Sequence, residues 1–294
     1  MKDAEMASGL SLTIVVPAYN EEGSIARTIR ELHPLAETAG ATLLVVNDGS
    51  TDRTAEILEE LSASHPALKT VHHERNRGYG AALRTGLRHA DTELVAITDA
   101  DGTYPNDRLL ELAELCKDQD MVVGSRTGAG VHYSKIRAIP KIFLKRWVSW
   151  IAGRTVPDIN SGLRVFRRDV ANRFIGIFPN GFSFTITITL AMLTTQRRVS
   201  FVPIGYAQRV GKSKIRPIRD TARFLNIILR TGVYFAPIRA FFPFIAVLFL
   251  AATVSLGFDL YNRDLTEKTL LLFLFSMNTG MFTLLADMID KRSS

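Results

Sequence analysis

The stretch Leu94-Val-Ala-Ile-Thr-Asp-Ala-Asp-Gly-Thr-Tyr-Pro105 is a short apolar run that ends in two acids, Asp99 and Asp101. If the run is a strand, alternation places both carboxylates on one face, where they repel unless water or a divalent cation separates them. Mg²⁺ and Mn²⁺ prefer oxygen ligands and commonly take one or two carboxylates together with phosphate oxygens. A solvated turn is the alternative, because Asp and Gly also favour turns.

Around this stretch, apolar runs alternate with segments of helical period. The runs predicted as strands are Leu12 to Val16, Thr42 to Val46, Leu68 to Val71, Leu94 to Ile97 and Met121 to Val123. The segments predicted as helices are Ser24 to Glu37, Thr54 to Ser64, Gly78 to Ala90 and Asn106 to Lys117. Such alternation is typical of an α/β domain with a mostly parallel sheet.

Polar turns follow the first four predicted strands. They are Pro17 to Glu21, Asn47 to Asp52, Asn76 to Gly80 and the turn that holds the two acids. The carboxyl ends of parallel strands meet at one edge of a sheet, and ligands of such sheets collect there. Each turn alone could be an ordinary surface loop, but four at one edge indicate a binding site and favour the cation over the solvated turn.

Two common phosphate-binding patterns are excluded by single positions. Gly78-Tyr-Gly80 would need a third glycine at Leu83 to match a dinucleotide fingerprint. Gly211-Lys-Ser213 resembles the end of a P-loop, yet Tyr206 stands where that loop needs its first glycine.

The charge of the chain indicates an anionic partner. There are 36 Lys and Arg residues against 29 Asp and Glu, which gives a net charge of +7. The basic residues concentrate between Arg126 and Arg239, beside the most apolar sequence, so we expect an acidic membrane surface rather than nucleic acid. The single cysteine, Cys116, excludes an internal disulfide and is expected in the core, and the pair His72 and His73 is expected to be solvated.

Taken together, the motifs resemble those of family 2 glycosyltransferases of the GT-A fold. Within that family the chain is most similar to the dolichyl-phosphate mannosyltransferase and polyprenyl-phosphate glycosyltransferase group, over roughly residues 11 to 220. The matching segments are the four turns together with Gly124-Ser-Arg126, Asp158-Ile-Asn-Ser-Gly-Leu-Arg164 and Arg209-Val-Gly-Lys-Ser-Lys214. Each segment is short, but the ordered set is specific.

The resemblance implies a nucleotide-sugar donor site. Pro17, Tyr19, Glu21 and Asp48 would line the nucleotide pocket. Asp99 and Asp101 would hold Mg²⁺ or Mn²⁺ against the diphosphate, and Arg209 and Lys214 would add positive charge there, unless they form a solvated loop or contact lipid headgroups. Related mannosyltransferases often carry a Gln ligand two residues after the second acid, where this chain has Thr103, so we expect water to complete the metal shell. GDP-mannose and UDP-glucose are the expected donors.

The resemblance also implies a polyprenyl phosphate acceptor. Its phosphate oxygen is already anionic near neutral pH, so no strong general base is needed and the reaction is expected to invert the anomeric carbon. Arg126, Arg137, Lys135 and Arg164 are the residues expected to bind this phosphate. Asp158 would orient these cations. In the alternative enzymatic function, transfer to a glycolipid hydroxyl, Asp158 would act as the base. A third reading is a catalytically idle protein that recruits another transferase.

The C-terminal third is predicted to meet the membrane. Two apolar segments of 18 residues, Phe241 to Phe258 and Thr269 to Ala286, are expected to form a transmembrane hairpin, with a buried soluble hairpin as the alternative. A basic amphipathic helix from Arg216 to Arg230 and a weaker one at Ile139 to Ile151, with Trp147 and Trp150, are expected at the interface unless they simply pack on the domain. For residues 182–190 the local pattern favours a strand and the resemblance a helix; we expect the helix.

These features predict three parts: a catalytic domain at residues 1–214, a juxtamembrane helix at 215–238 and a hairpin at 239–294. Basic residues flank the hairpin at Arg230, Arg239, Lys291 and Arg292, whereas the joining segment from Asp259 to Lys268 is slightly acidic. By the positive-inside rule both termini, and with them the catalytic domain, are expected in the cytosol. The N-terminal residues show no apolar run typical of a signal peptide.

Overall fold

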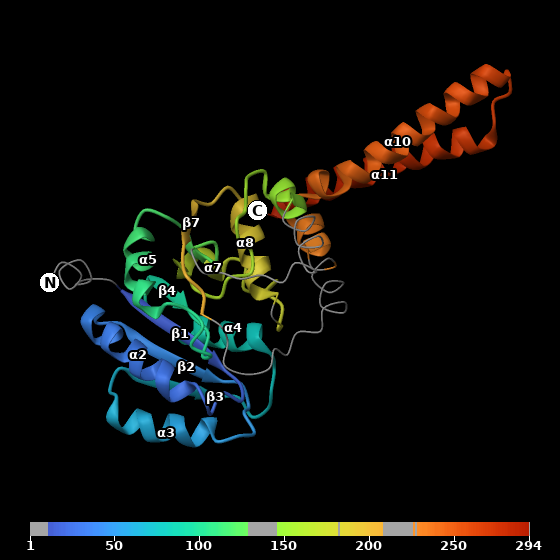
Figure 1. The fold of residues 1–294 in the computed structure, drawn as a ribbon. Coiled ribbons are helices and arrows are strands. Elements are labelled where there is room, and N and C mark those ends of the chain that lie inside the picture. The colour runs from blue at the N-terminus through green and yellow to red at the C-terminus, as the bar shows by residue number, and fades with distance from the viewer. Residues whose placement is uncertain (1–10, 129–145, 182, 208–225, 227, 294) are drawn as a thin grey trace.

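A seven-stranded sheet forms the centre of the domain (Figure 1). The computed structural model describes residues 11–128, 146–181, 183–207, 226 and 228–293. The sheet order is β3-β2-β1-β4-β6-β5-β7, and β6 alone runs antiparallel to its neighbours among these strands. The strands are β1 (Leu12–Ala18), β2 (Thr42–Asn47), β3 (Leu68–His72), β4 (Leu94–Ile97), β5 (Met121–Ser125), β6 (Arg164–Arg167) and β7 (Val199–Pro203). The predicted mostly parallel sheet is confirmed.

Helices connect the strands and cover both faces of the sheet. Those of the domain are α2 (Ile25–Ala39), α3 (Thr54–Ser64), α4 (Tyr79–His89), the 3-10 turn η1 (Asn106–Arg108), α5 (Leu109–Leu115), α7 (Arg168–Asn172) and α8 (Phe184–Thr194). The four helices predicted before residue 120 are confirmed, the last of them beginning as the 3-10 turn. The helix preferred over a strand for residues 182–190 is confirmed by α8.

Two apolar cores lie on opposite faces of the sheet. Residues of α2, α3 and α5 belong to one core, and residues of α4, α7 and α8 to the other. Along β1, Ile14 belongs to the first core and its neighbour Val15 to the second, as strand alternation requires. Because both faces are covered, the central strands are nearly continuous apolar runs, which is why the sequence predicts them well. Cys116 is fully buried in the first core, as expected.

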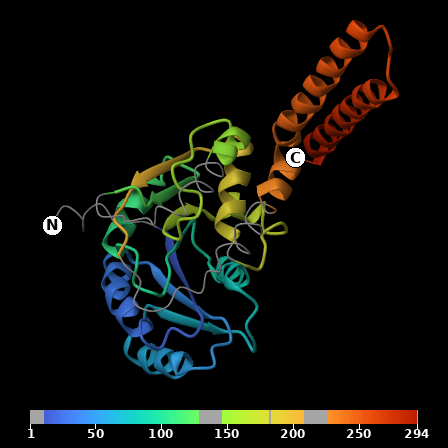
Figure 2. The ribbon, with the colours of Figure 1, turned by 45° about the vertical axis from the view of Figure 1, so that its right-hand side comes forward.

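Two long helices, α10 (Pro237–Asn262) and α11 (Glu267–Ser293), pack side by side and project from the domain (Figure 2). Both are long and apolar enough to cross a membrane, and they contain the two predicted spans. Only 11% of the most apolar window of α10 and 17% of that of α11 are buried. Core helices of a soluble protein are mostly buried, so the low burial of α10 and α11 within the described chain disfavours the alternative of a buried soluble hairpin.

Much of the predicted interface helices lies outside the described residues. The basic segment from Arg216 is described only from residue 226, with helix at 228–235, and of Ile139 to Ile151 only the part from residue 146 is described. In that part Ile151 is buried, and Trp147 packs against the second core. Trp150 is exposed, and its indole N–H donates to the carbonyl of Arg239 at the start of α10 at 2.8 Å. This segment therefore joins the domain to the base of the hairpin.

Candidate active site

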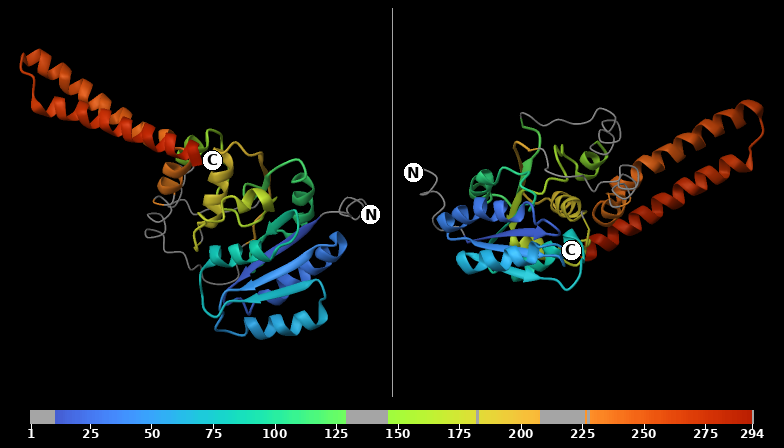
Figure 3. Two further views of the ribbon diagram at one scale, coloured as in Figure 1. Left: turned by 180° about the vertical axis from the view of Figure 1, so that it is seen from behind. Right: turned by 60° about the horizontal axis from the view of Figure 1, so that its bottom comes forward.

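The topology collects the predicted site residues at one edge of the sheet. β1 to β4 and β5 end at this edge, which carries the turns after the first four strands and places Arg126 directly after β5. β6 runs the other way and begins here, with Arg164 opposite Ile97 of β4 and Val123 of β5. The loop at residues 158–163 before β6 therefore lies at the same edge. Two further views show the sheet with helices on both of its faces (Figure 3). The expected convergence of the polar turns is confirmed.

Asp99 and Asp101 lie in the turn after β4, which we call the acid turn (residues 98–104). Because β4 ends at Ile97, strand alternation does not orient the two side chains, and the expectation that alternation places them on one face is wrong. Each carboxylate is instead held by a hydroxyl. The Tyr79 hydroxyl donates to Asp99 Oδ1 at 2.8 Å, and the Thr103 hydroxyl donates to Asp101 Oδ1 at 2.7 Å.

The acid turn and the 158–163 loop form one packed unit. A Cβ on Gly162 would come within 2.8 Å of Asp99 Oδ2, so only glycine allows this approach. The backbone N–H of Gly162 donates to the Tyr104 hydroxyl at 2.6 Å. Burial, and then the nearby Asp99 charge, raise the pKa of both Tyr79 and Tyr104, which therefore keep their hydroxyl protons. The donor-side acids and the expected acceptor loop thus contact each other directly.

The acid turn fits a hard divalent cation. Its two carboxylates supply oxygen ligands. Within the described residues no group of three or more His, Cys, Asp or Glu side chains could hold a metal, so the protein would offer these two carboxylates rather than a full set of ligands. A site with two protein carboxylates suits Mg²⁺ or Mn²⁺ when substrate phosphates and water complete the shell. Thr103 is buried, and its hydroxyl and backbone N–H both donate hydrogen bonds to Asp101 Oδ1. Thr103 therefore orients this acid.

The expected nucleotide-side residues follow β1 and β2. Pro17 is buried within β1, opposite Val46, and Tyr19 is 36% exposed just beyond it. Glu21 accepts a hydrogen bond from the Ser24 hydroxyl at 2.8 Å. These residues therefore lie at the predicted edge.

Asp48 does not present its carboxylate at the surface, contrary to its expected place in the lining of the nucleotide pocket. It is 2% exposed, and its oxygens accept hydrogen bonds from the backbone N–H groups of Arg77 and Gly78 at 2.9 and 2.7 Å. His73 Nδ1 lies 2.7 Å from Asp48 Oδ1, and Nε2 lies 2.9 Å from the Thr85 hydroxyl. Asp48 thus fixes the 73–78 loop. The expectation of a solvated pair holds for His72 and is wrong for His73, whose side chain is 5% exposed.

Arg126 and Asp158 form a bidentate ion pair beside the acid turn. Arg126 Nε and Nη2 donate to the two Asp158 oxygens at 2.7 and 3.0 Å, and the guanidinium lies 5.3 Å from the centre of the Tyr206 ring. Burial opposes both charges, but the paired hydrogen bonds prevail. They raise the pKa of Arg126 and hold the pKa of Asp158 below its ordinary value. Both groups are therefore charged at neutral pH.

Arg164 does not reach the surface where an acceptor phosphate would bind, and that expectation is wrong. It is fully buried between the 158–163 loop and α8. Its guanidinium donates to the carbonyls of Ser161 and Thr185, the latter at 3.1 Å, and to the Thr189 hydroxyl at 2.9 Å. Burial lowers the pKa of Arg164 to about 10. Arg164 therefore fixes the loop that carries Asp158.

Four expected site residues, Lys135, Arg137, Arg209 and Lys214, lie outside the described residues. The chain that leads to residue 208 is placed beside the acid turn, because Ala207 N–H donates to the Thr103 carbonyl at 2.9 Å and Tyr206 stacks edge-on against Tyr104. Sequence reasoning missed the buried tyrosines and Thr103 as orienting groups. These residues lie in or next to the motif segments, and this proximity was the available sign that they orient the acids.

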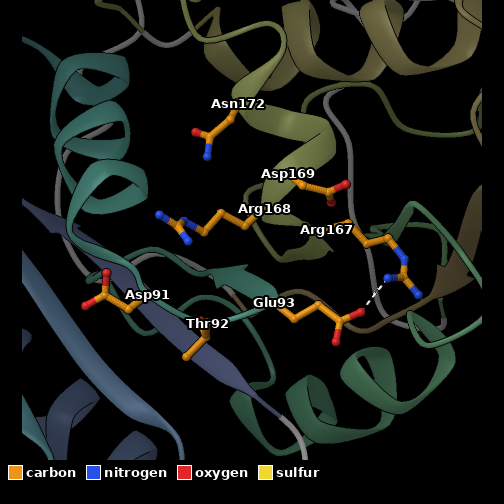
Figure 4. Close-up of a pocket in the computed structure, with 7 residues that line it drawn as sticks. All are labelled: Asp91, Thr92, Glu93, Arg167, Arg168, Asp169 and Asn172. Atoms are coloured by element: carbon orange, nitrogen blue, oxygen red, sulfur yellow. Dashed lines mark hydrogen bonds and ion pairs between the residues drawn. The ribbon is translucent and has the colours of Figure 1, made fainter.

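A polar pocket lies at the opposite edge of the sheet. Its lining comes from residues that precede β4 or belong to the end of β6 and to α7, namely Asp91, Thr92, Glu93, Arg167, Arg168, Asp169 and Asn172 (Figure 4). Arg167 pairs there with Glu93. Because Arg167 aligns with Leu94 at the start of β4, this pocket is separate from the acid turn at the end of that strand.

Similarity to known proteins agrees with this geometry. The glycosyl transferase family 2 model matches residues 13–174, which is more than half of the chain. A dolichyl-phosphate hexose transferase of Haloferax volcanii is 31% identical over 74% of this chain and 92% of its own length. An undecaprenyl-phosphate mannosyltransferase of Micrococcus luteus is 27% identical over 68% of this chain and 86% of its own length.

Solved structures agree in fold. The glucosyl-3-phosphoglycerate synthase of Mycobacterium tuberculosis, solved with Mn²⁺, uridine diphosphate and phosphoglyceric acid, has a TM-score of 0.59 to this chain. The likeness covers 79% of this chain and 81% of the synthase, at 18% sequence identity. The chain accordingly belongs to glycosyl transferase family 2 and is a glycosyltransferase with a GT-A-like α/β domain.

Proposed function

We propose that the protein transfers a hexose, with inversion, from a nucleotide-sugar donor to a polyprenyl phosphate at the cytosolic face of a membrane, with Mg²⁺ or Mn²⁺ as cofactor. The observation that supports the proposal is the Arg126–Asp158 pair, because it holds a guanidinium, a group able to bind a phosphate through two N–H groups, beside the acid turn. Guanidinium groups match the geometry of phosphate oxygens. The named activities of the relatives support a polyprenyl phosphate acceptor.

The proposed reaction is a direct displacement. An anionic oxygen of the acceptor phosphate attacks the anomeric carbon, the bond from that carbon to the donor diphosphate breaks, and the nucleoside diphosphate leaves with the bonding electrons. A phosphate monoester is largely ionised at neutral pH, so no proton has to be removed. A bound divalent cation would neutralise charge on the leaving diphosphate. Asp99 and Asp101 would hold this cation, while Arg126 orients the acceptor.

The state of Asp158 disfavours the rival acceptor, a glycolipid hydroxyl. A general base works best with a pKa near the working pH, but Arg126 keeps the pKa of Asp158 below its ordinary value. Both Asp158 oxygens already accept hydrogen bonds from Arg126. Asp158 is therefore better suited to hold Arg126 than to take a proton. The presence of both acids and of Arg126 argues against a catalytically idle recruitment protein.

The proposed membrane arrangement rests on the hairpin and its flanking charges. Arg230 and Arg239 lie on the domain side of the hairpin, as do Lys291 and Arg292 at the end of α11, whereas the turn between α10 and α11 carries only two basic residues, Arg263 and Lys268. The positive-inside rule then puts the domain on the cytosolic side. Trp150, which contacts the base of α10, would lie near the headgroups, so the site would face the leaflet that presents the acceptor.

The test is a transfer assay with purified full-length protein in detergent. The donors are GDP-mannose and UDP-glucose, and the acceptors are a short polyprenyl phosphate and the polyprenol of the same length. We expect sugar transfer to the phosphate alone, loss of transfer with EDTA, recovery with Mn²⁺ or Mg²⁺, and a product of inverted anomeric configuration by NMR. Transfer to polyprenol or to a glycolipid hydroxyl but not to the phosphate would overturn the proposed acceptor.

A further inference from the structure

The outer face of α11 carries an apolar stripe with one polar residue in the middle. The stripe consists of Leu271, Leu274, Asn278, Met281, Leu285 and Met288. Its spacing is three, four, three, four and three residues, which is the heptad repeat of a coiled-coil seam. The apolar members are between 49% and 57% exposed, and Asn278 is exposed as well. Within the described chain, nothing covers this stripe.

The opposite face of α11 already has its partner in α10. Thr269, Ser276 and Thr283 recur every seven residues and are buried, and the Thr269 hydroxyl lies 2.6 Å from the Ser255 hydroxyl of α10. Ser276 and Asn278 are two residues apart, about 200° around a helix, so they lie on opposite sides. The stripe is therefore a second face, left over after the hairpin has formed.

Asn278 stands at the depth where a polar group is most costly. It is the central residue of the candidate span Glu267–Ile289. The described residues give its amide no hydrogen-bond partner. A polar side chain in hydrocarbon is best accommodated by a hydrogen bond to another helix. An asparagine amide carries both donors and an acceptor, so it can pair with a second asparagine.

We infer that this stripe is the contact between two copies of the protein, whose α11 helices pair in parallel through Asn278. Two copies inserted with their domains on the same side are related by an axis along the membrane normal. That axis brings each Asn278 to the same depth as its counterpart. Asn278 and Leu271 fall at the first position of the heptad, where a single asparagine fixes the register of parallel helices. The inference rests on the proposed membrane insertion but not on the proposed reaction.

Disulfide cross-linking of the full-length protein in isolated membranes tests the face. The background is Cys116→Ala, which removes the single native cysteine. Leu274→Cys and Met281→Cys lie on the stripe, whereas Phe275→Cys and Phe282→Cys lie next to them at positions that are more exposed. We expect covalent dimers on oxidation for the two stripe variants and not for the two phenylalanine variants.

The role of the amide is tested by a matched pair of variants. Asn278→Leu removes the amide, and Thr279→Val makes a similar polar-to-apolar change one residue away, where the hydroxyl already donates to Phe275 of the same helix at 2.7 Å. Interhelical hydrogen bonds in membranes correspond to roughly 3- to 30-fold in association, and we expect Asn278→Leu to weaken dimerisation in detergent by about this factor. Thr279→Val and Asn278→Gln should leave it nearly unchanged.

Several outcomes would overturn the inference. They are a monomer at all concentrations, equal cross-linking on both faces, cross-links only to a protein of different size, or release of the protein from membranes by alkaline carbonate. A monomer that still transfers sugar would refute the dimer and leave the proposed function intact. A dimer without transferase activity would support the dimer and refute the proposed function.

Discussion

Two buried carboxylates at the same edge of the sheet are held in different ways. Asp48, in the nucleotide half (residues 11–104), is held by two backbone N–H groups and a histidine ring. Asp158, in the acceptor half (residues 121–207), also accepts two backbone N–H groups, and its side-chain partner is the guanidinium of Arg126. The two carboxylates therefore differ in their side-chain partner, which is a buried histidine ring for Asp48 and a phosphate-matching guanidinium for Asp158. We expect the nucleotide half to stay fixed and the guanidinium of the acceptor half to be exchangeable between Asp158 and a substrate phosphate.

The largest expected effect concerns the acid turn, which joins the two halves. Asp101→Asn removes one carboxylate from the proposed cation site and should lower kcat by on the order of 10³, about 4 kcal/mol in the barrier. The apparent affinity for Mn²⁺ should fall as well. Asp107→Asn changes an exposed acid a few residues away and serves as the control. Full activity of Asp101→Asn at ordinary metal concentrations would contradict a metal role for the acid turn.

The second prediction tests whether Arg126 is exchangeable. Arg126→Lys keeps the charge but loses the bidentate geometry, so kcat/KM for polyprenyl phosphate should fall by roughly 10- to 100-fold. KM for the nucleotide sugar should stay unchanged, because the pair lies in the acceptor half. Steady-state kinetics with each substrate varied in turn measure both. Arg154→Lys, at an exposed arginine, is the control. A change in donor KM alone would show that Arg126 binds the nucleotide sugar and not the acceptor phosphate.

The sequence predicts the nucleotide half closely because three of its strands, β1, β2 and β4, are buried on both faces. β4, for example, was expected at Leu94 to Ile97 and is found there. β6 and β7 were not predicted from the sequence. β6 consists of Arg-Val-Phe-Arg, and a strand that buries an arginine at its first residue breaks the apolar pattern on which the prediction rests.

The same limit applies to individual side chains of the site. Sequence motifs place Asp48 and Arg164 at the correct edge but cannot tell which polar groups face inward. Asp48 is buried because the 73–78 loop folds over it, a contact between residues about thirty positions apart. Arg164 is buried because carbonyls of the 158–163 loop and of α8 accept its hydrogen bonds. Both outcomes depend on tertiary contacts that no local pattern encodes.

The third prediction concerns the hydroxyls that orient the acids. Tyr79→Phe and Thr103→Val each remove one hydrogen bond to a carboxylate and keep the shape of the side chain. Loss of an orienting partner typically weakens metal binding by about 10- to 100-fold, and we expect the lower end. Titration of activity with Mn²⁺, and Mn²⁺ binding followed by EPR in the presence of nucleotide, measure this. Tyr234→Phe, at an exposed tyrosine, controls for loss of a hydroxyl elsewhere. Unchanged Mn²⁺ affinity would reduce Tyr79 and Thr103 to packing roles.

The smallest effect on activity is expected for Asp48→Asn. The amide places its NH₂ group where the carboxylate accepts backbone hydrogen bonds, so at least one buried N–H loses its acceptor. An unsatisfied buried group destabilises a fold by about 1–3 kcal/mol, and Tm should fall by roughly 2–4 °C for each kcal/mol. A thermal melt of the purified protein measures this. The donor KM of the folded protein should change little, because the carboxylate faces the loop. A raised donor KM at unchanged Tm would show instead that Asp48 contacts the nucleotide, and the nucleotide half would then be as exchangeable as the acceptor half.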